Sequence, residues 1–413
     1  GAEEAEAGQP PRPPLPPPGA VPAPADAGLE EQVAELASAL APRAADRAAK
    51  EQLLAFVQDL LWLSYGRQAR VYSYGSSVTG CGEAKSDVDA TVFIPAGEEG
   101  EPGPTEASRW THLRNIAQAV GRHPWLRVVE RRLGARVPIL TLELRDASGR
   151  GTGYLCDLNF GNMLPLYNSR LLRTYAELVP EIPVLAVLVK RWAKAHDLDK
   201  TFDHYISPYS WTLMVVYYLQ VKRQVPSLHA LARLREGRPP RGPGDLDPLF
   251  VSESDEALRL LAAGPLGGEA GEEARRRGPG AGLLGGEGLA GLLRGFFEFY
   301  SEEFAWDREV VSVRLGERRH RGDGGAGFNA QLSALAPRPA ADPGQQAAIS
   351  MPPFLNIEDP VEVWRNLNYA LEPDSGKRLR RSVLDAHAFL GASGGQPGAL
   401  RELLRVPPPA AER

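Results

Sequence analysis

Apolar residues recur every three or four positions from residue 29 to residue 63, which is the spacing of an amphipathic helix. The series breaks at Ala41 and Pro42, and proline interrupts a helix because it lacks a backbone N–H. The pattern therefore predicts two N-terminal helices within residues 29–63. We expect their apolar faces to pack against the C-terminal part of the chain.

Short runs of apolar and β-branched residues replace this helical period in the next hundred residues. The runs cover residues 69–74, 88–94, 126–132, 137–144 and 154–160. One helical stretch lies among them, near residues 110–120. Several strands mixed with few helices predict a mixed-sheet domain over residues 64–165.

The helical period returns after residue 165 and continues to residue 391. The predicted helices cover residues 169–178, 183–196, 208–222, 289–304, 360–371 and 379–389. Residues 237–287 and 323–346 are dense in Gly, Pro, Ala, Arg and Glu, so we interpret them as flexible insertions, with one helix compatible with residues 255–262. The predicted fold class is therefore α+β and bilobal, with a mostly helical domain over residues 166–391.

Composition changes the picture at both ends of the chain. Residues 1–28 are rich in Pro and Ala and hold almost no bulky apolar side chains, so we expect a disordered tail. Residues 392–413 are also expected to be loose. The chain begins with Gly rather than Met, so an original targeting peptide could have been removed, and the expected compartment stays open between the cytoplasm and the mitochondrial matrix.

Charge and cysteine content limit the classes of protein that fit. The 47 basic and 52 acidic residues give a net charge of −5, which is unusual for a protein that coats a polyanion but compatible with a local basic groove. No stretch approaches 18 uninterrupted apolar residues, so we expect no membrane span. Two cysteines, without histidines at zinc-binding spacing, leave carboxylates as the expected metal ligands.

Two carboxylates at the start of the second predicted strand form the strongest candidate site. Side chains alternate along a strand, so Asp87 and Asp89 share one face while Val88 points into the core. Such a pair repels itself unless a cation lies between the groups, and Mg²⁺ or Mn²⁺ is the expected occupant. Asp157 alternates with apolar neighbours in the last predicted strand and is the candidate third ligand of a two-metal site.

A glycine-serine turn lies upstream of this pair. Glycine at position 75 allows the backbone to approach a phosphate closely, and the hydroxyls of Ser76 and Ser77 are candidate partners for phosphate oxygens. A metal-held phosphate beside such a turn favours nucleotidyl transfer, in which a hydroxyl displaces pyrophosphate. The alternative is that Asp-x-Asp is a solvated strand end. The combined spacing of Gly75, Asp87 and Asp157 argues against this alternative.

On these residues the chain resembles the DNA polymerase β-like nucleotidyltransferases. Its helical part resembles the branch of terminal uridylyltransferases and noncanonical poly(A) polymerases, and most of all the compact uridylyltransferases of trypanosomatids. The resemblance implies a palm domain followed by a helical poly(A)-polymerase-associated domain. It also implies that Asn168 and Ser169 begin a ribose-binding helix and that Lys190 and Lys194 meet a triphosphate.

The same resemblance implies that Tyr209 stacks on the nucleotide base. Pro208 stands where the family has a phosphate-binding serine, so that contact is lost or moves to Ser207. Each role has a structural alternative: Asn168 as a helix cap, the two lysines as a solvated face, and Tyr209 as a core side chain.

The choice of base is expected to depend on three charged residues near the C-terminus. Asp359 and Glu362 flank a proline in a pattern that also fits a capped helix start, which is a sufficient structural alternative. The resemblance implies that these two carboxylates read a base edge. Uracil N3–H can donate to a carboxylate, and the donor-only guanidinium of Arg365 suits uracil O4 and opposes the amino group of adenine.

These expectations combine into a template-independent uridylyltransferase that adds UMP to the 3′ end of RNA. The RNA 3′-hydroxyl would attack the α-phosphate of UTP and release pyrophosphate, with Asp157 as the activating base. The expected partners are UTP, a single-stranded RNA 3′ end and a protein complex that supplies RNA specificity, with a monomer as the default state. The alternatives left open are a noncanonical poly(A) polymerase, a relaxed ribonucleotidyltransferase, and a nonenzymatic RNA-binding scaffold that recruits an RNA editing or decay complex.

Basic clusters are candidates for contact with the RNA strand, although a solvated surface explains each of them as well. They comprise Arg122, Arg127, Arg131, Arg132 and Arg136, then Arg318, Arg319 and Arg321, and finally Lys377, Arg378, Arg380 and Arg381.

Overall fold

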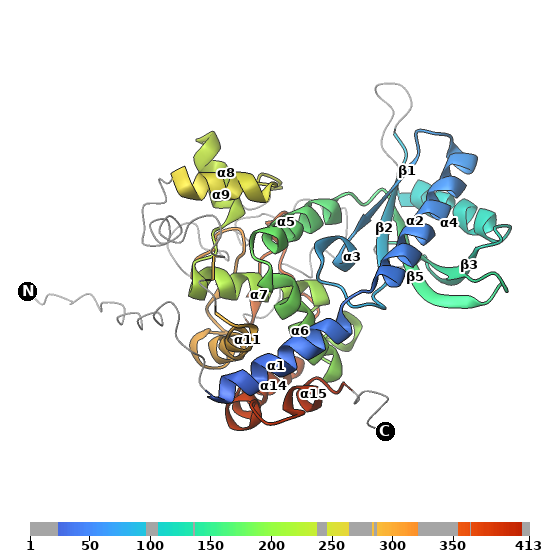
Figure 1. The fold of residues 1–413 in the computed structure, drawn as a ribbon. Coiled ribbons are helices and arrows are strands. Elements are labelled where there is room, and N and C mark those ends of the chain that lie inside the picture. Colours follow the sequence, from blue (N-terminus) through green and yellow to red (C-terminus); the bar gives the residue numbers. More distant parts are fainter. Residues whose placement is uncertain are drawn as a thin grey trace, which may run out of the picture.

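The computed structural model is an α+β fold with a five-stranded mixed sheet on one side and a helical part on the other (Figure 1). It describes residues 24–95, 106–134, 137–237, 246–263, 283–284, 287–320, 354–363 and 365–406. Each part has its own hydrophobic core. None of the described helices is both long enough and apolar enough to serve as a membrane span.

The sheet has the strand order β1-β2-β5-β4-β3. The strands are β1 (Arg70–Tyr74), β2 (Val88–Phe93), β3 (Leu126–Arg132), β4 (Ile139–Arg145) and β5 (Gly151–Phe160). β2 and β5 are parallel, and the other neighbouring pairs are antiparallel. All five strands lie where the sequence pattern predicted them.

One face of the sheet is covered by helices α2 (Ala44–Tyr65) and α4 (Glu106–Val120), as Figure 1 shows. Alternation places Val88, Ala90 and Val92 in this core with at most 1% of each side chain exposed. The intervening residues of β2 therefore point to the other face of the sheet, where the acidic residues lie.

The helical part is built around α7 (Pro208–Arg223), whose residues from Ser210 to Gln220 are all buried. The other helices are α1 (Pro24–Leu40), α5 (Leu164–Leu178), α6 (Glu181–Ala195), α8 (Leu228–Glu236), α9 (Ser254–Ala263), α11 (Leu289–Glu298), α14 (Pro373–Ser393) and α15 (Ala399–Leu403). Short elements complete it: α3 (Ser76–Thr79) beside the sheet, the turns η1 (Thr201–Asp203) and η2 (Phe299–Glu303), and the pair β6 (Val310–Val311) and β7 (Asn356–Ile357).

The two N-terminal helices belong to different cores, which corrects the expectation that both pack with the C-terminal helices. Leu29, Val33 and Leu36 of α1 lie in the helical core as expected. In contrast, Leu53 and Val57 of α2 lie in the core of the sheet. The break near Pro42 is thus the point where the chain passes from one part to the other.

The expected helix over residues 360–371 is wrong. Asp359 Oδ1 accepts hydrogen bonds from the N–H groups of Val361 and Glu362, as a helix cap would, both at 3.0 Å. The N–H of Asp359, however, donates to the carbonyl of Arg365 at 3.0 Å and closes a loop instead. Leu246 also bridges to Glu362, so a separate chain segment takes the backbone groups that a helix would need.

Two segments expected to be loose contain packed structure. Within the first expected insertion, Phe250, Val251 and Ala257 lie in the helical core. Near the C-terminus, Leu400 and Leu404 are buried against that core, with at most 1% of each exposed. Residues 1–23, 323–346 and 407–413 lie outside the described residues. Both cysteines are free and buried.

Candidate active site

Three carboxylates gather on the face of the sheet opposite its apolar core, two on adjacent strands and one just before β2. Asp89 on β2 and Asp157 on β5 are direct register partners, so their side chains leave the same face side by side. Asp87 immediately precedes β2. Burial and the charges of Asp157 and Asp87 raise the pKa of Asp89 from 3.8 to about 7. Burial, followed by the charge of Asp157, also raises the pKa of Asp87.

Asp157 already has polar partners from the two strands beyond it. Its Oδ2 accepts a hydrogen bond from Arg132 Nη2 of β3 at 2.6 Å, and its Oδ1 accepts one from Thr141 Oγ1 of β4 at 2.6 Å. Sequence reasoning placed Arg132 only among possible RNA contacts and did not identify Thr141. Thr141 pairs with Asp157 across β4 and β5, so only the strand register could have revealed it.

The carboxylate set suits a divalent cation, because Mg²⁺ prefers oxygen ligands from carboxylates. Within the described ranges no three His, Cys, Asp or Glu side chains form a ready metal site. Both carboxylate oxygens of Asp157 accept hydrogen bonds, one from Arg132 and one from Thr141. Burial, and then the charges of Asp157 and Asp87, raise the pKa of Asp89, so a cation beside it would favour its ionised form. A divalent cation would supply the missing positive charge at Asp87 and Asp89, with Asp157 as the third ligand.

Gly75 brings the turn between β1 and α3 against this cluster. Its φ is +73°, a value that L-residues with a Cβ avoid, and a Cβ there would lie 2.5 Å from Asp89 Oδ2. Its N–H donates to Ser169 Oγ of α5 at 2.7 Å, and that hydroxyl donates to the carbonyl of Pro165 at 2.7 Å. Ser169, expected to bind nucleotide, therefore joins the helical part to the sheet.

Replacement of Gly75 by Ala should disable the site through this close contact. The added Cβ would displace the Asp89 carboxylate, and displacements of about 1 Å can reduce catalysis about 10²-fold. The matched control is Gly149→Ala, because Gly149 has φ +79° and no neighbouring atom within 4 Å of the added Cβ. Both variants should lose about 1–2 kcal/mol of stability from backbone strain, measured by chemical denaturation. Only Gly75→Ala should lose RNA extension activity. Equal loss of activity in both variants would contradict the role given to the contact between Gly75 and Asp89.

The other serines expected to bind nucleotide differ in their contacts. Ser77 Oγ donates to the carbonyl of Tyr74 at 3.3 Å. Ser76 lies beside Gly82, where a Cβ on that glycine would lie 3.4 Å from Ser76 Oγ. Ser207 Oγ caps α7 and accepts from the N–H of Ser210 at 3.2 Å.

The two lysines expected to meet a triphosphate differ in their surroundings. Lys194 is exposed on α6, and its charge is one of those that counteract the rise in the pKa of Asp87. Lys190 is directed at the carbonyl of Cys81, and burial lowers the pKa of its ammonium group. Lys50 of α2, which sequence reasoning missed, also lies near Asp87 and opposes the rise in its pKa.

A second group of polar residues surrounds Tyr209 at the start of α7. Burial raises the pKa of the Tyr209 phenol, and the charge of Asp359 raises it further. Burial also raises the pKa of Asp359 to about 6. Arg365 Nη1 donates to Glu362 Oε2 at 2.9 Å, and its guanidinium lies 5.8 Å from the ring centre of Tyr369.

Three buried polar atoms of the expected nucleotide-binding residues make no hydrogen bond to the described protein. They are Asn168 Oδ1, Tyr209 Oη and Asp359 Oδ2. Buried polar atoms in folded proteins almost always have partners, so such atoms in one enzyme site are candidates for contact with a ligand. Among the described residues, no hydrogen bond or ion pair joins the Tyr209 group directly to the three aspartates.

Several of the basic side chains expected to track RNA have partners within the protein. Arg127 pairs with Glu143, Arg318 with the buried Glu309, and Arg378 with the phenol of Tyr205. Arg136 and Arg321 lie outside the described residues. Arg131 is exposed on the edge strand β3 and has Leu140 of β4 as its register partner.

Two family models match the two parts of the chain. The model described as Poly(A) RNA polymerase, mitochondrial-like, central palm domain matches residues 29–177, which include all three aspartates. The model described as Cid1 family poly A polymerase matches residues 288–364, which include Asp359 and Glu362.

Known proteins of two activities align with the chain. Terminal uridylyltransferase 4 of Homo sapiens is 28% identical over 277 residues, which are 67% of this chain and 15% of that protein. Poly(A) RNA polymerase GLD2 of Mus musculus is 29% identical over 298 residues, which are 71% of this chain and 55% of that protein. The chain therefore spans less than two thirds of the length of either relative.

Solved structures share the fold. A cytoplasmic RNA terminal U-transferase aligns with a TM-score of 0.66 and 20% identity, over 94% of this chain and 100% of the other. The Cid1 poly(U) polymerase aligns with a TM-score of 0.62 and 20% identity, over 88% of this chain and 94% of the other. A GLD-2/RNP-8 complex also aligns with a TM-score of 0.62 and 20% identity, over 93% of this chain and 99% of the other.

The palm-like sheet, its paired aspartates and these matches define a nucleotidyltransferase of the DNA polymerase β-like class. Within that class, the chain belongs to the branch of terminal uridylyltransferases and noncanonical poly(A) polymerases.

Proposed function

We propose that the chain adds nucleotides to the 3′ end of RNA without a template and prefers UTP. The acidic cluster of Asp87, Asp89 and Asp157 supports the transfer chemistry, which relatives named as uridylyltransferases and poly(A) polymerases share. The observation that carries the uridine preference is Asp359 Oδ2, a buried acceptor without a partner among the described residues. Uracil N3–H is a donor, whereas adenine N1 is an acceptor that such an oxygen would repel.

The aspartates and Arg132 would have different roles in the transfer reaction. Divalent metal ions held by Asp87, Asp89 and Asp157 would supply positive charge to the α-phosphate and the leaving pyrophosphate. Asp157 would accept the proton of the RNA 3′-hydroxyl. The hydroxyl oxygen would bond to the α-phosphorus while the bond from the α-phosphorus to the bridging oxygen of the leaving pyrophosphate breaks. Arg132, already hydrogen-bonded to Asp157 Oδ2, would hold that carboxylate in position.

Nucleotide recognition would use the residues on the helical side. Tyr209 would stack on the base, Asn168 would accept from a ribose hydroxyl, and Lys194 would contact the phosphates. Arg365 would donate to uracil O4 while Glu362 holds its guanidinium in place. Because net charge is negative, we also propose that a protein partner supplies part of the RNA specificity.

The test incubates the purified chain with labelled single-stranded RNA, Mg²⁺ and each of the four NTPs separately, and resolves the products by length. We expect extension with UTP to exceed extension with ATP, and we expect no extension by the control variant Asp87→Asn. Stronger extension with ATP than with UTP would contradict the uridine preference and indicate a poly(A) polymerase. If no NTP is used, with or without added partner proteins, the transfer reaction itself is refuted for this chain.

A further inference from the structure

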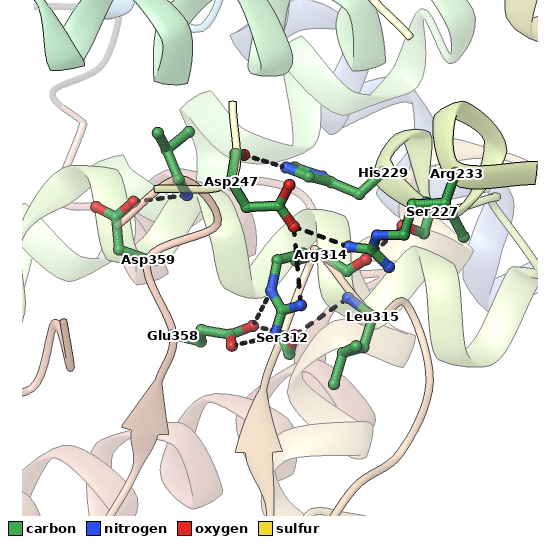
Figure 2. A network of polar contacts seen from close by, with 11 residues as sticks. Ser227, His229, Arg233, Asp247, Ser312, Arg314, Leu315, Glu358 and Asp359 are labelled. Carbon is green, nitrogen blue, oxygen red and sulfur yellow. Dashed lines mark hydrogen bonds and ion pairs between the residues drawn. The ribbon is translucent and has the colours of Figure 1, made fainter. Parts of the chain in front are cut away.

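A buried network of four charged residues lies directly behind the loop that carries Asp359 and Glu362 (Figure 2). We call it the ion network, and its members are Arg233, Asp247, Arg314 and Glu358. They come from α8, from the segment before α9, from the chain after β6 and from the end of β7. At most 10% of each of these side chains is exposed.

Arg314 is the centre of this network. Its Nη2 donates to Glu358 Oε1 at 2.6 Å and its Nε lies 3.3 Å from Glu358 Oε2, so the pair is bidentate. Its Nη1 lies 3.9 Å from Asp247 Oδ2, on the opposite side, as Figure 2 shows. Ser312 Oγ adds a further hydrogen bond to Glu358. One guanidinium therefore links two acidic residues from distant parts of the chain.

Both acidic partners are attached to the loop of residues 358–366. Glu358 is the residue before Asp359, and its N–H donates to the carbonyl of Val311 at 3.0 Å. Asp247 donates its N–H to the carbonyl of Val361 at 2.8 Å, and its neighbour Leu246 bridges to Glu362. The network thus fixes the loop on both sides of the turn in which Asp359 Oδ1 holds the N–H groups of Val361 and Glu362.

The charges within the network balance without help from solvent. Arg233 Nη2 donates to Asp247 Oδ2 at 3.0 Å, so the two arginines face two carboxylates. His229 lies against the carbonyl of Asp247 at 3.3 Å. Its burial, and then the charges of Arg233 and Arg314, lower its pKa to about 3, so it remains neutral. Buried ion pairs often add little net stability compared with apolar side chains, but they fix geometry.

We propose that Arg314 is a positioning residue for nucleotide selection, acting through Glu358 and Asp247 to hold Asp359 and Glu362 in the orientation that discriminates between bases. The proposal rests on the proposed function, in which Asp359 faces the base and Glu362 holds the guanidinium of Arg365 against it. The described residues 358–363 and 365–366 contain no helix, and β-bridges and single hydrogen bonds join them to neighbouring segments. Without the ion network, small movements of the loop would displace Asp359 Oδ2 relative to the base.

The test compares kcat and KM for UTP and ATP in the wild-type chain, in Glu358→Gln and in Arg314→Lys. The lysine keeps the charge but loses the bidentate geometry. We expect the ratio of kcat/KM between the preferred and the rejected nucleotide to fall at least about fivefold. The loss should be in KM for the preferred nucleotide, with little change in kcat. The matched control is Arg223→Lys, because Arg223 also forms a bidentate pair, with Glu287, and does not touch the loop.

A second variant separates positioning from folding. The double replacement Arg314→Met and Glu358→Met removes both charges and preserves apolar volume, which buried ion pairs often tolerate without loss of stability. This variant should keep a wild-type melting temperature but lose selectivity. Variants that lose activity with UTP and ATP in parallel, or that keep the wild-type ratio, would overturn the proposal. A wild-type chain without nucleotide preference would instead refute the proposed function. The kinetics of the wild-type chain with UTP and ATP, measured first, distinguish that outcome from failure of the positioning proposal.

Discussion

Asp89→Asn is expected to abolish nucleotide addition while making the metal-free protein more stable. The raised pKa of Asp89, about 7 instead of 3.8, means that its ionised form is disfavoured in the folded protein. Asparagine is close in shape and carries no charge, so it removes the repulsion from Asp87 and Asp157. It also removes a metal ligand, and the lost transition-state stabilisation of several kcal/mol corresponds to a rate loss of at least about 10³-fold.

The stability effect has a definite dependence on pH. A carboxyl whose pKa is raised on folding destabilises the folded state as pH increases from the unfolded value towards the folded one, here from 3.8 to about 7. In EDTA, wild-type stability should fall across that range, and at pH 8 Asp89→Asn should be about 1–3 kcal/mol more stable in urea denaturation. The control Asp385→Asn alters an exposed ion pair with Arg381 and should change neither quantity. An Asp89→Asn variant that is less stable in EDTA would show that the carboxylates do not repel.

Asp359→Asn is expected to change which nucleotide is used while leaving the loop intact. The side-chain oxygen of asparagine can still accept from the N–H groups of Val361 and Glu362. The amide nitrogen replaces Oδ2, so a buried acceptor without a partner becomes a donor. Unmatched polar groups cost about 1–3 kcal/mol each, so the ratio of kcat/KM for UTP over ATP should fall about 10- to 100-fold.

The pH dependence of selectivity gives an independent check of this assignment. Burial raises the pKa of Asp359 to about 6, so a lower pH should protonate it and mimic the asparagine. Wild-type preference for UTP should therefore weaken below pH 6, whereas Asp359→Asn should show no such change. The control Asp374→Asn lies on the surface of α14 with 94% of its side chain exposed, and should behave as wild type. Unchanged selectivity in Asp359→Asn would show that this carboxylate does not take part in base recognition.

The strands and the acidic cluster could be predicted because local pattern determines them. Period-two alternation around Asp89 and Asp157 required that both leave the apolar core, and a parallel sheet then placed them side by side. The contribution of Thr141 depends on the register between β4 and β5, which no local pattern encodes. The same limit applies to Lys50, whose helix was expected to pack on the other part of the chain.

The loop around Asp359 could not be predicted because its helix-like signals are satisfied by distant segments. Aspartate, proline and glutamate at these positions are typical of a helix start, and Asp359 does form the expected local hydrogen bonds. The backbone groups beyond them are bonded to residues 246–247, more than a hundred positions earlier. Tertiary contacts therefore override the local preference in a loop that presents an unpartnered carboxylate oxygen, Asp359 Oδ2.

The division of α1 and α2 between the two cores also determines how the parts can move. The chain crosses between them at two described points, one between α1 and α2 and one between β5 and α5. Hydrogen bonds anchor both crossings, from Ala84 N–H to the carbonyl of Leu40 at 3.0 Å and from Asn162 N–H to Thr91 Oγ1 at 3.2 Å. Noncovalent contacts also join the two parts, because Gly75 N–H donates to Ser169 Oγ and Lys190 donates to the carbonyl of Cys81. The two crossings and these contacts together restrict the relative movement of the sheet and the helices.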